Sequence, residues 1–312
     1  MVAGKLAVLA AFTPLLLTGA EGDDTLTYAR CPVRDGAEAG GTIWLLCEAR
    51  EVYTSADAGK SWVQTQLPNE FKQRAIAARD GQHAVIVGDY GNVWMTADRG
   101  KSWQKVTVPV DSTLTDVQFF GDLAWIGGYS GVILHSKDAG KTWTRQPTVG
   151  SVSVESVSFA DASHGIAVGW AGAILRTVDG GVTWEPIKSP AALWSFNSVF
   201  MRDKDSAWAV GMSGQLMSTK DGGATWTSQK LDLAGSLTSV FFDRQGRGWI
   251  TSDREIYFST NGGAAWTPSG LNDWIFLNEI IESGNSLLAL SPLRVLRKED
   301  RSWEPLRTWL RN

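Results

Sequence analysis

Short stretches in which apolar and polar residues alternate recur along the chain at a nearly constant interval. Residues 154–159 alternate in this way and predict a strand with one buried face. Residues 165–169 are almost all apolar, which is typical of a strand buried on both faces. Residues 173–177 and 183–187 complete a set of four short strands. No helical period of useful length follows residue 20, so the pattern predicts an all-β protein.

The same four-strand pattern occurs in the preceding unit, at residues 114–120, 124–128, 132–136 and 142–146. Four short strands with tight turns in about 40 residues are typical of one blade of a β-propeller. No linker or change of composition interrupts the units. We therefore predict a single propeller domain over residues 21–312, built from four-stranded antiparallel blades.

An eight-residue segment that ends in Trp joins the third and fourth predicted strands of each unit. Residues 177–184 read T-V-D-G-G-V-T-W, and residues 55–62 read S-A-D-A-G-K-S-W. A degenerate seventh copy contributes only its last two residues, Ser302 and Trp303. The repeats therefore predict seven blades. The six clear copies end at tryptophans 40 to 42 residues apart: Trp62, Trp103, Trp143, Trp184, Trp226 and Trp266.

The third position of this segment is Asp or Asn in all six clear copies. Asp followed by Gly favours a turn, because the carboxylate accepts backbone N–H groups and Gly adopts a positive φ. The hydroxyl residues near each end can bind the same turn, and Trp fills the space beside it. We interpret the third-position residues as structural: Asp57, Asp98, Asp138, Asp179, Asp221 and Asn261.

The segment resembles the Asp-box, or bacterial neuraminidase repeat, which lies between the third and fourth strands of propeller blades. Sialidases, sortilin-type receptors, some xyloglucan hydrolases and the photosystem II stability/assembly factors carry it. The resemblance therefore implies the fold more firmly than the function.

Residues 1–20 have the character of a secretory signal. Lys5 precedes an apolar run over residues 6–17, and the small residues Thr18 and Ala20 suit cleavage before Glu21. A retained anchor helix is the alternative, but the run is short for a bilayer span. No second long apolar segment exists, so we expect an exported chain that does not insert into a membrane.

Two cysteines, Cys31 and Cys47, are expected to form a disulfide, because an even pair in an exported protein favours one. Predicted strands at 28–33 and 43–47, joined by a Gly-rich loop over 34–41, would bring them face to face. A redox pair is the alternative, although the spacing is not C-x-x-C. Two thiols and three dispersed histidines predict no metal site, and no motif indicates a cofactor.

The composition narrows the possible functions. A formal net charge of −4 without a basic cluster argues against nucleic acid as a partner. The sialidase Arg-Ile-Pro motif has only a poor counterpart in Arg30-Cys31-Pro32, and no zinc-protease, nucleophile-elbow or phosphate-loop motif occurs. The short repeats also leave out the long loops that build a glycan pocket. We therefore predict that the chain is not an enzyme and assign no catalytic residue.

The candidate binding surface is the face opposite the Asp boxes. Bulky residues at turn tips are difficult to bury, so several of them are expected to be exposed there. Phe71, Phe196 and Phe276 lie in the blade connections on the same face. The alternative is that the rings only cap the core, which Trp125, Trp208 and Trp249 are expected to occupy. The candidate partner-binding residues are Tyr90, Tyr129, Trp170, Trp194, Met212, Trp274 and Arg74.

Residues 154–184 and 197–226 carry the repeat V-x-S-V-x-F…G-x-A-V-G-x-x-G-x-I-L-R-T-x-D-G-G-x-T-W and are most similar to the photosystem II stability/assembly factor family. That resemblance implies a seven-bladed propeller without known catalysis, exported to a periplasm or thylakoid lumen, which binds membrane-protein intermediates. Cyanobacterial and plant members of the family use an arginine-rich patch. No repeat position carries arginine throughout this chain, since the residues equivalent to Arg176 in other repeats are Met95, His135 and Ser218.

We therefore expect a monomeric, exported propeller that binds a membrane-protein complex or assembly intermediate. A sialidase-like glycoside hydrolase or a glycan-binding propeller is the alternative. An enzyme of that kind needs paired carboxylates at the channel mouth, whereas an assembly factor needs an apolar, partly cationic surface.

Overall fold

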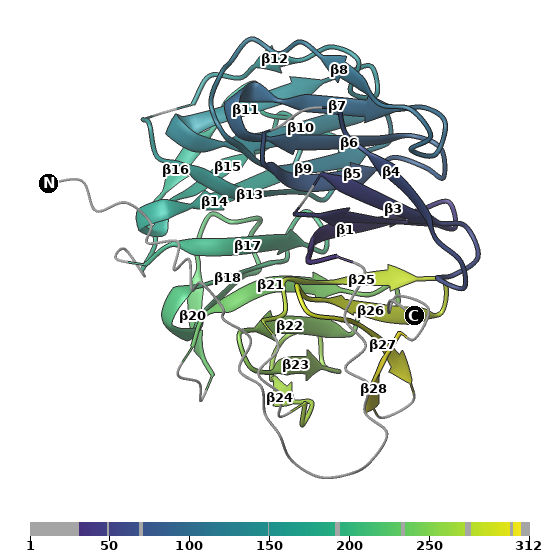
Figure 1. Ribbon diagram of the computed structural model, residues 1–312. Helices are drawn as coiled ribbons and strands as arrows, with labels where there is room; N and C mark the ends of the chain where they lie inside the picture. Colours follow the sequence, from purple (N-terminus) through teal and green to yellow (C-terminus); the bar gives the residue numbers. More distant parts are fainter. Residues whose placement is uncertain are drawn as a thin grey trace, which may run out of the picture.

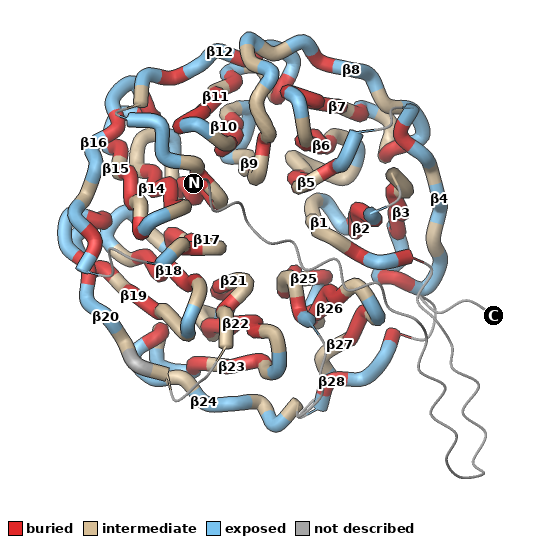
Figure 2. The backbone as a smooth tube through the Cα atoms, turned by 60° about the vertical axis from the view of Figure 1, so that its left-hand side comes forward, coloured by how far each residue is buried: buried red, intermediate tan, exposed pale blue. Residues whose placement is uncertain are grey.

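The computed structural model describes residues 31–48, 50–68, 71–148, 150–190, 194–231, 235–271, 276–299 and 302–306. The expected signal, residues 1–20, and the candidate Trp274 lie outside these ranges. Seven sheets of four antiparallel strands are arranged as the blades of a ring around a central channel (Figures 1 and 2). The predicted seven-bladed propeller is therefore confirmed. Within the described ranges no helix has the length and apolar character needed to cross a membrane.

Each blade uses four consecutive strands, from the channel to the rim. Blades 1 and 2 contain β1 (Val33–Ala39), β2 (Thr42–Cys47), β3 (Glu51–Ser55), β4 (Val63–Gln66), β5 (Gln73–Ala78), β6 (Ala84–Gly88), β7 (Val93–Thr96) and β8 (Gln104–Val106). Blades 3 and 4 contain β9 (Leu114–Phe120), β10 (Leu123–Gly128), β11 (Val132–Ser136), β12 (Thr144–Arg145), β13 (Val154–Phe159), β14 (Gly165–Gly169), β15 (Ile174–Thr177) and β16 (Glu185–Ile187).

Blades 5 and 6 contain β17 (Phe196–Met201), β18 (Ala207–Gly211), β19 (Gln215–Thr219), β20 (Thr227–Lys230), β21 (Leu237–Phe242), β22 (Gly248–Ser252), β23 (Ile256–Ser259) and β24 (Thr267–Pro268). Blade 7 contains β25 (Glu279–Ser283), β26 (Ser286–Leu290), β27 (Val295–Glu299) and β28 (Ser302–Pro305). The first strand of each blade lines the channel and the fourth lies at the rim (Figure 2).

The core lies between adjacent blades. Second strands such as β14 and β18 are buried along their whole length, because a sheet packs against each of their faces. Between blades 4 and 5, for example, Val168 and Ile174 share one apolar cluster with Phe196 and Val199. Trp125, Trp208 and Trp249 are buried in second strands, as predicted.

The Asp boxes form the hydrogen-bonded turns that their composition predicts. In blade 4 the Asp179 carboxylate accepts the hydroxyls of Thr177 (2.8 Å) and Thr183 (2.7 Å) and the backbone N–H of Thr183 (2.9 Å). The Thr177 hydroxyl in turn accepts the N–H of Gly181. The boxes of blades 1, 2, 3 and 5 repeat this network.

The box of blade 6 keeps the turn but loses a bond and a charge. Asn261 accepts the Ser259 hydroxyl and the Ala265 N–H, at 2.8 and 2.9 Å. Ala265 has no hydroxyl, so the side-chain bond made by Thr183 in blade 4 has no counterpart here.

Among the described residues, blades 7 and 1 close the ring without an exchanged strand. The Asn278 amide of blade 7 donates to the carbonyl of Val33 in β1, at 2.7 Å. On the outer side, the Arg297 guanidinium donates to the Ala58 carbonyl in the first Asp box. A continuous apolar cluster that includes Leu45 and Leu288 fills the interface. Packing and side-chain hydrogen bonds therefore close the ring.

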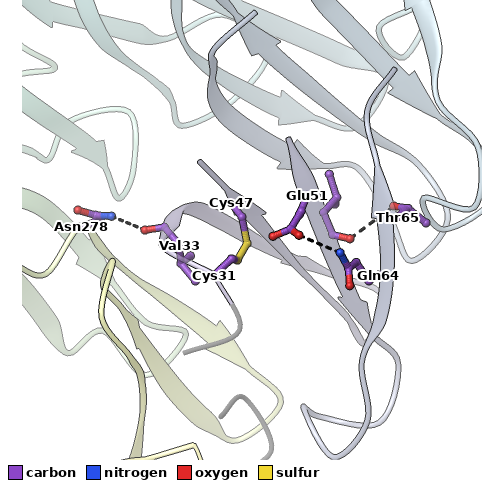
Figure 3. Close-up of a disulfide and its surroundings, with 8 residues drawn as sticks. Cys31, Val33, Cys47, Glu51, Gln64, Thr65 and Asn278 are labelled. Carbon is purple, nitrogen blue, oxygen red and sulfur yellow. Dashed lines mark hydrogen bonds between the residues drawn. A yellow bond between two sulfur atoms is a disulfide. The ribbon is translucent and has the colours of Figure 1, made fainter. Parts of the chain in front are cut away.

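The predicted loop at 34–41 is wrong, because most of it forms β1. Gly40 and Gly41 both have positive φ and make the hairpin turn alone, so the preceding polar residues stay in the strand. The disulfide is nevertheless present: Cys31 precedes β1, Cys47 is opposite Val33, and the two cysteine Cα atoms are 5.9 Å apart (Figure 3).

Replacing Asp179 with Ala removes a carboxylate that accepts three hydrogen bonds within its turn. We expect a loss of about 1–3 kcal/mol in the free energy of unfolding, measured by denaturant titration. Asp122→Ala is the control, because the exposed Asp122 side chain has one ion pair among the described residues, with Arg79. Equal stability of the two variants would contradict a structural role for the boxes.

The disulfide closes a loop with a sequence separation of 16 residues. We expect the double variant Cys31→Ala, Cys47→Ala to lose on the order of 3 kcal/mol of stability. Thiol titration of the denatured, unreduced protein checks the bond directly and should detect no free thiol. Two reactive thiols per chain would show that the bond does not form in solution.

Candidate binding face

The turns between second and third strands lie on the same face as the blade connections, because successive strands reverse direction. We call this the connection face, and the opposite one the Asp-box face. In blades 2 to 5 these turns are single 3₁₀ turns: η1 (Asp89–Gly91), η2 (Tyr129–Gly131), η3 (Trp170–Gly172) and η4 (Met212–Gly214). Each turn holds its middle residue at a positive φ, which fixes the direction of the neighbouring side chains.

Two candidate rings are clearly exposed on the connection face, since Tyr90 is 68% and Trp194 49% accessible. Phe71 and Phe276 are exposed nearby in the blade connections. Tyr129, Trp170 and Met212 are half-buried. Phe196 does not belong to this surface: it begins β17 with its side chain wholly buried, because it is paired with Gly211 in the second strand.

The exposed and half-buried rings pack on one another. The centroids of Phe71 and Tyr90 are 5.3 Å apart, and those of Tyr129 and Trp170, from adjacent blades, are 5.5 Å apart. The Trp170 indole N–H donates to the carboxylate of Glu155 at the channel. The connection face therefore carries aromatic pairs whose outer edges remain open to a partner.

A β-bulge at the start of the first strand shapes the channel mouth. The extra residue projects into a pocket of about 310 Å³ that is lined by the first strands. In three blades the bulged residue binds the next blade. Thr115 donates to the carbonyl of Val154 at 2.8 Å, and Asn197 and Thr238 donate to the carbonyls of Leu237 and Leu277. The bulged residues in blades 1 to 6 are Arg34, Arg74, Thr115, Glu155, Asn197 and Thr238.

Cations gather where blades 1 and 2 meet this mouth. Arg34 pairs with Glu48 at 3.0 Å, and Arg74 pairs with Asp89 at 2.8 Å. Burial and the neighbouring charge of Arg74 lower the pKa of Arg34, and burial beside both guanidinium groups lowers the pKa of Lys72. We call Arg34, Lys72 and Arg74 the cationic corner. Of these three residues only Arg74 was predicted from the sequence, because the bulge that places Arg34 beside it has no sequence signal.

Three carboxyl groups converge one residue deeper in the channel. Asp35 accepts the backbone N–H of Ile76 in the next blade at 2.7 Å, and Asp116 accepts that of Val157 at 2.8 Å. Glu279 of blade 7 is hydrogen-bonded to Asp35 across the ring closure. No motif signals these residues, but all three occupy the same position of their inner strands, and an alignment of the repeats could have found them.

The pKa values of these three carboxyls are all raised. Burial raises the pKa of Asp116 to about 7, and burial raises the pKa of Asp35. Burial and the charge of Asp35 raise the pKa of Glu279 well above its ordinary value. Two carboxyl groups can form a hydrogen bond only when one of them carries a proton, so Asp35 and Glu279 share one.

Among the described residues, one group of ligand-type atoms is compact enough for a metal ion: the two cysteine sulfurs and the Glu51 carboxylate. The sulfurs are bonded to each other, and the Glu51 carboxylate accepts the Gln64 amide at 2.9 Å (Figure 3). Each of these three side chains therefore already has a partner within blade 1.

Comparison with known proteins places this architecture in a family. The model of the family described as Photosynthesis system II assembly factor YCF48 matches residues 54–152 and 148–269. A curated relative, the Photosystem II assembly lipoprotein Ycf48 of Synechococcus sp. (strain CC9902), is 24% identical over 166 residues. That alignment covers 47% of this chain and only 45% of the relative's length.

Solved structures share the fold. YCF48 bound to D1 peptide superposes with a TM-score of 0.64 at 20% identity, covering 78% of this chain and 84% of its own. YCF48 from Cyanidioschyzon merolae gives a TM-score of 0.71 at 16% identity, covering 88% and 97%. The GH74 enzyme of Niastella koreensis also gives 0.71, at 14% identity, but only 55% of that enzyme is covered.

At these identities the structures establish the propeller alone, and enzymes are among them. The family model is more specific, because its two matches cover most of the seven repeats in sequence. The chain belongs to the YCF48 family of photosystem II assembly factors.

Proposed function

We propose that this protein is an exported, non-catalytic assembly factor whose connection face binds an extended segment of a membrane protein. The observation that carries the proposal is that exposed aromatic rings and the cationic corner share this face. Aromatic side chains supply large contact area for few rotatable bonds, and Trp, Tyr and Arg dominate interface energies. The Asp-box face, by contrast, is occupied mainly by turn hydrogen bonds.

The relatives support the same class of partner. One structural neighbour is YCF48 in complex with a D1 peptide, and the curated relative is an assembly lipoprotein of photosystem II. By analogy we propose that this chain acts in a periplasm, or in a thylakoid lumen if its host is photosynthetic, on an assembly intermediate with a D1-like segment. We further propose that it acts as a monomer.

A glycoside hydrolase is the second candidate, because carboxyl groups with raised pKa values do meet in the channel. Their geometry favours a structural role. Glycosidase carboxyls lie about 5–9 Å apart on either side of the scissile bond, whereas Asp35 and Glu279 are hydrogen-bonded to each other. Asp35 and Asp116 also accept backbone N–H groups of neighbouring blades. We therefore propose that these carboxyls hold neighbouring blades together and do not act on a substrate.

Replacing two exposed rings should weaken the partner complex and leave the fold intact. We expect Tyr90→Ala with Trp194→Ala to lower affinity for D1-derived peptides by about 2–4 kcal/mol, measured by fluorescence anisotropy over an overlapping peptide set. The melting temperature should stay close to that of the wild type, because about half or more of each side chain is exposed.

The matched control is Phe120→Ala with Val182→Ala, which removes exposed apolar side chains from the Asp-box face. This variant should bind as the wild type does. Equal loss of affinity in both double variants would contradict the assignment of the connection face. Absence of binding by the wild type to every D1 peptide would contradict the partner class.

The channel carboxyls predict a pH dependence of stability. A carboxyl whose pKa is higher in the folded state stabilises the fold at low pH, and that contribution disappears as pH rises through the folded-state pKa. We expect the wild type to lose on the order of 2 kcal/mol from these groups between pH 5 and 8. In Glu279→Gln the amide donates to Asp35 in place of the shared proton, so its loss should be smaller.

Denaturant titrations at both pH values measure this difference. Glu282→Gln, from the same strand, is the control, because Glu282 pairs with Arg244 at the far end of the channel. It should keep the full pH dependence. If Glu279→Gln behaves as the control does, the shared proton does not contribute to ring closure.

A further inference from the structure

The end of the central channel that opens on the Asp-box face contains a pocket of about 360 Å³. Residues of the inner strands β1, β5, β9, β21 and β25, which surround the channel, line this pocket (Figure 2). The volume is within the range of small-molecule sites in proteins. The pocket lies at the opposite end of the channel from the cationic corner, so the function proposed above does not explain it.

The walls of this pocket are largely apolar. Ala37 of blade 1 and Ala77 of blade 2 occupy the third position after the bulge, where blade 6 carries Phe241. The two small side chains leave space on their side of the channel, and the half-buried rings of Phe119 and Phe241 belong to the lining. Such a wall favours a ligand with an apolar or aromatic body.

Two carboxylates lie at the rim of the pocket with little exposure to water. The Glu38 side chain, near the end of β1, is 10% exposed, and that of Glu282, near the end of β25, is 16% exposed. The Glu38 Oε1 atom accepts the backbone N–H of Gly41 at 2.9 Å. Carboxylates with so little hydration need a closely placed cation.

Arg244 supplies this charge incompletely. Its guanidinium lies 3.6 Å from the Glu38 carboxylate and 3.6 Å from that of Glu282, and both distances exceed an ordinary hydrogen bond. The Arg244 side chain extends from the turn between β21 and β22 and is 72% exposed, so water weakens both ion pairs. Among the described residues that line the pocket, Arg244 is the one cation, so one negative charge at the rim has no match.

Two other arginines in the turns of this face have closer partners of their own. Arg79 lies 2.7 Å from Asp122, and Arg247 lies 2.7 Å from Asp243. Because each of these cations is matched by its own carboxylate, neither compensates the carboxylates at the rim of the pocket. The rim therefore favours an added cation.

We propose that this pocket binds a small organic ammonium with an aromatic or apolar body. Since the single Arg244 guanidinium reaches both Glu38 and Glu282, one ammonium in its place can contact both carboxylates. An ammonium offers three donors and is smaller than a guanidinium, so it can approach them more closely. Arg244 turns outward into water, and the ligand body lies against Ala37 and Ala77.

Titration with phenethylammonium, followed through the methyl signals of ¹³C-labelled alanine, tests the proposal. The Ala37 and Ala77 signals, assigned by their absence in Ala37→Ser and Ala77→Ser, should shift along a saturable curve at millimolar concentration. Phenethyl alcohol, which has the same ring without the charge, should bind about fivefold more weakly or less. No saturable shift with phenethylammonium in the folded wild type overturns the proposal, and an equal affinity for phenethyl alcohol overturns the assignment to an ammonium.

Three variants locate the site. Arg244→Ala removes the competing cation and should tighten phenethylammonium binding about threefold, whereas Glu38→Gln should weaken it about fivefold. Ala77→Phe introduces the ring that blade 6 carries at this position and should abolish binding. Glu304→Gln, from the exposed outer strand β28, is the control and should bind normally. Weaker binding in folded Arg244→Ala, or equal affinities in Glu38→Gln and Glu304→Gln, overturns the location.

Discussion

Among the described residues, adjacent blades share no backbone hydrogen-bond ladder, and side chains of most inner strands bind the next blade instead. Asp35 and Asp116 accept backbone N–H groups of the following inner strand, and Ser156 and Ser198 do the same for blades 5 and 6. Bulged residues such as Thr115 supply the complementary donors to carbonyls. The positions of all the faces, turns and clefts depend on this succession of contacts around the channel.

Different residues meet this constraint in different blades. A position that must satisfy a main-chain N–H can hold Asp, Ser or Glu, and a position that must satisfy a carbonyl can hold Thr or Asn. The bonds between blades therefore persist while the charge around the channel varies. Cations lie on blades 1 and 2, and carboxyls with raised pKa values lie on blades 7, 1 and 3.

The fold was predictable from sequence because its determinants are local. The box from Thr177 to Trp184 specifies a turn by itself, and its repetition gives the number of blades. The error at 34–41 arose where a strand carries turn-forming residues for reasons outside its own segment, since Asp35 binds Ile76 of the next blade. Exposure of Tyr90 and Trp194 was predictable from their turns and connections, whereas burial of Phe196 depended on its pairing with Gly211.

The four 3₁₀ turns of blades 2 to 5 have one further consequence. Their middle residues, Tyr90, Ser130, Ala171 and Ser213, all have φ between 53 and 59°, so four different sequences adopt one backbone shape. Side chains at these turns can therefore be exchanged without remodelling the scaffold beneath them. Point substitutions at these turns of the connection face could therefore give related proteins different partners without a change in the fold.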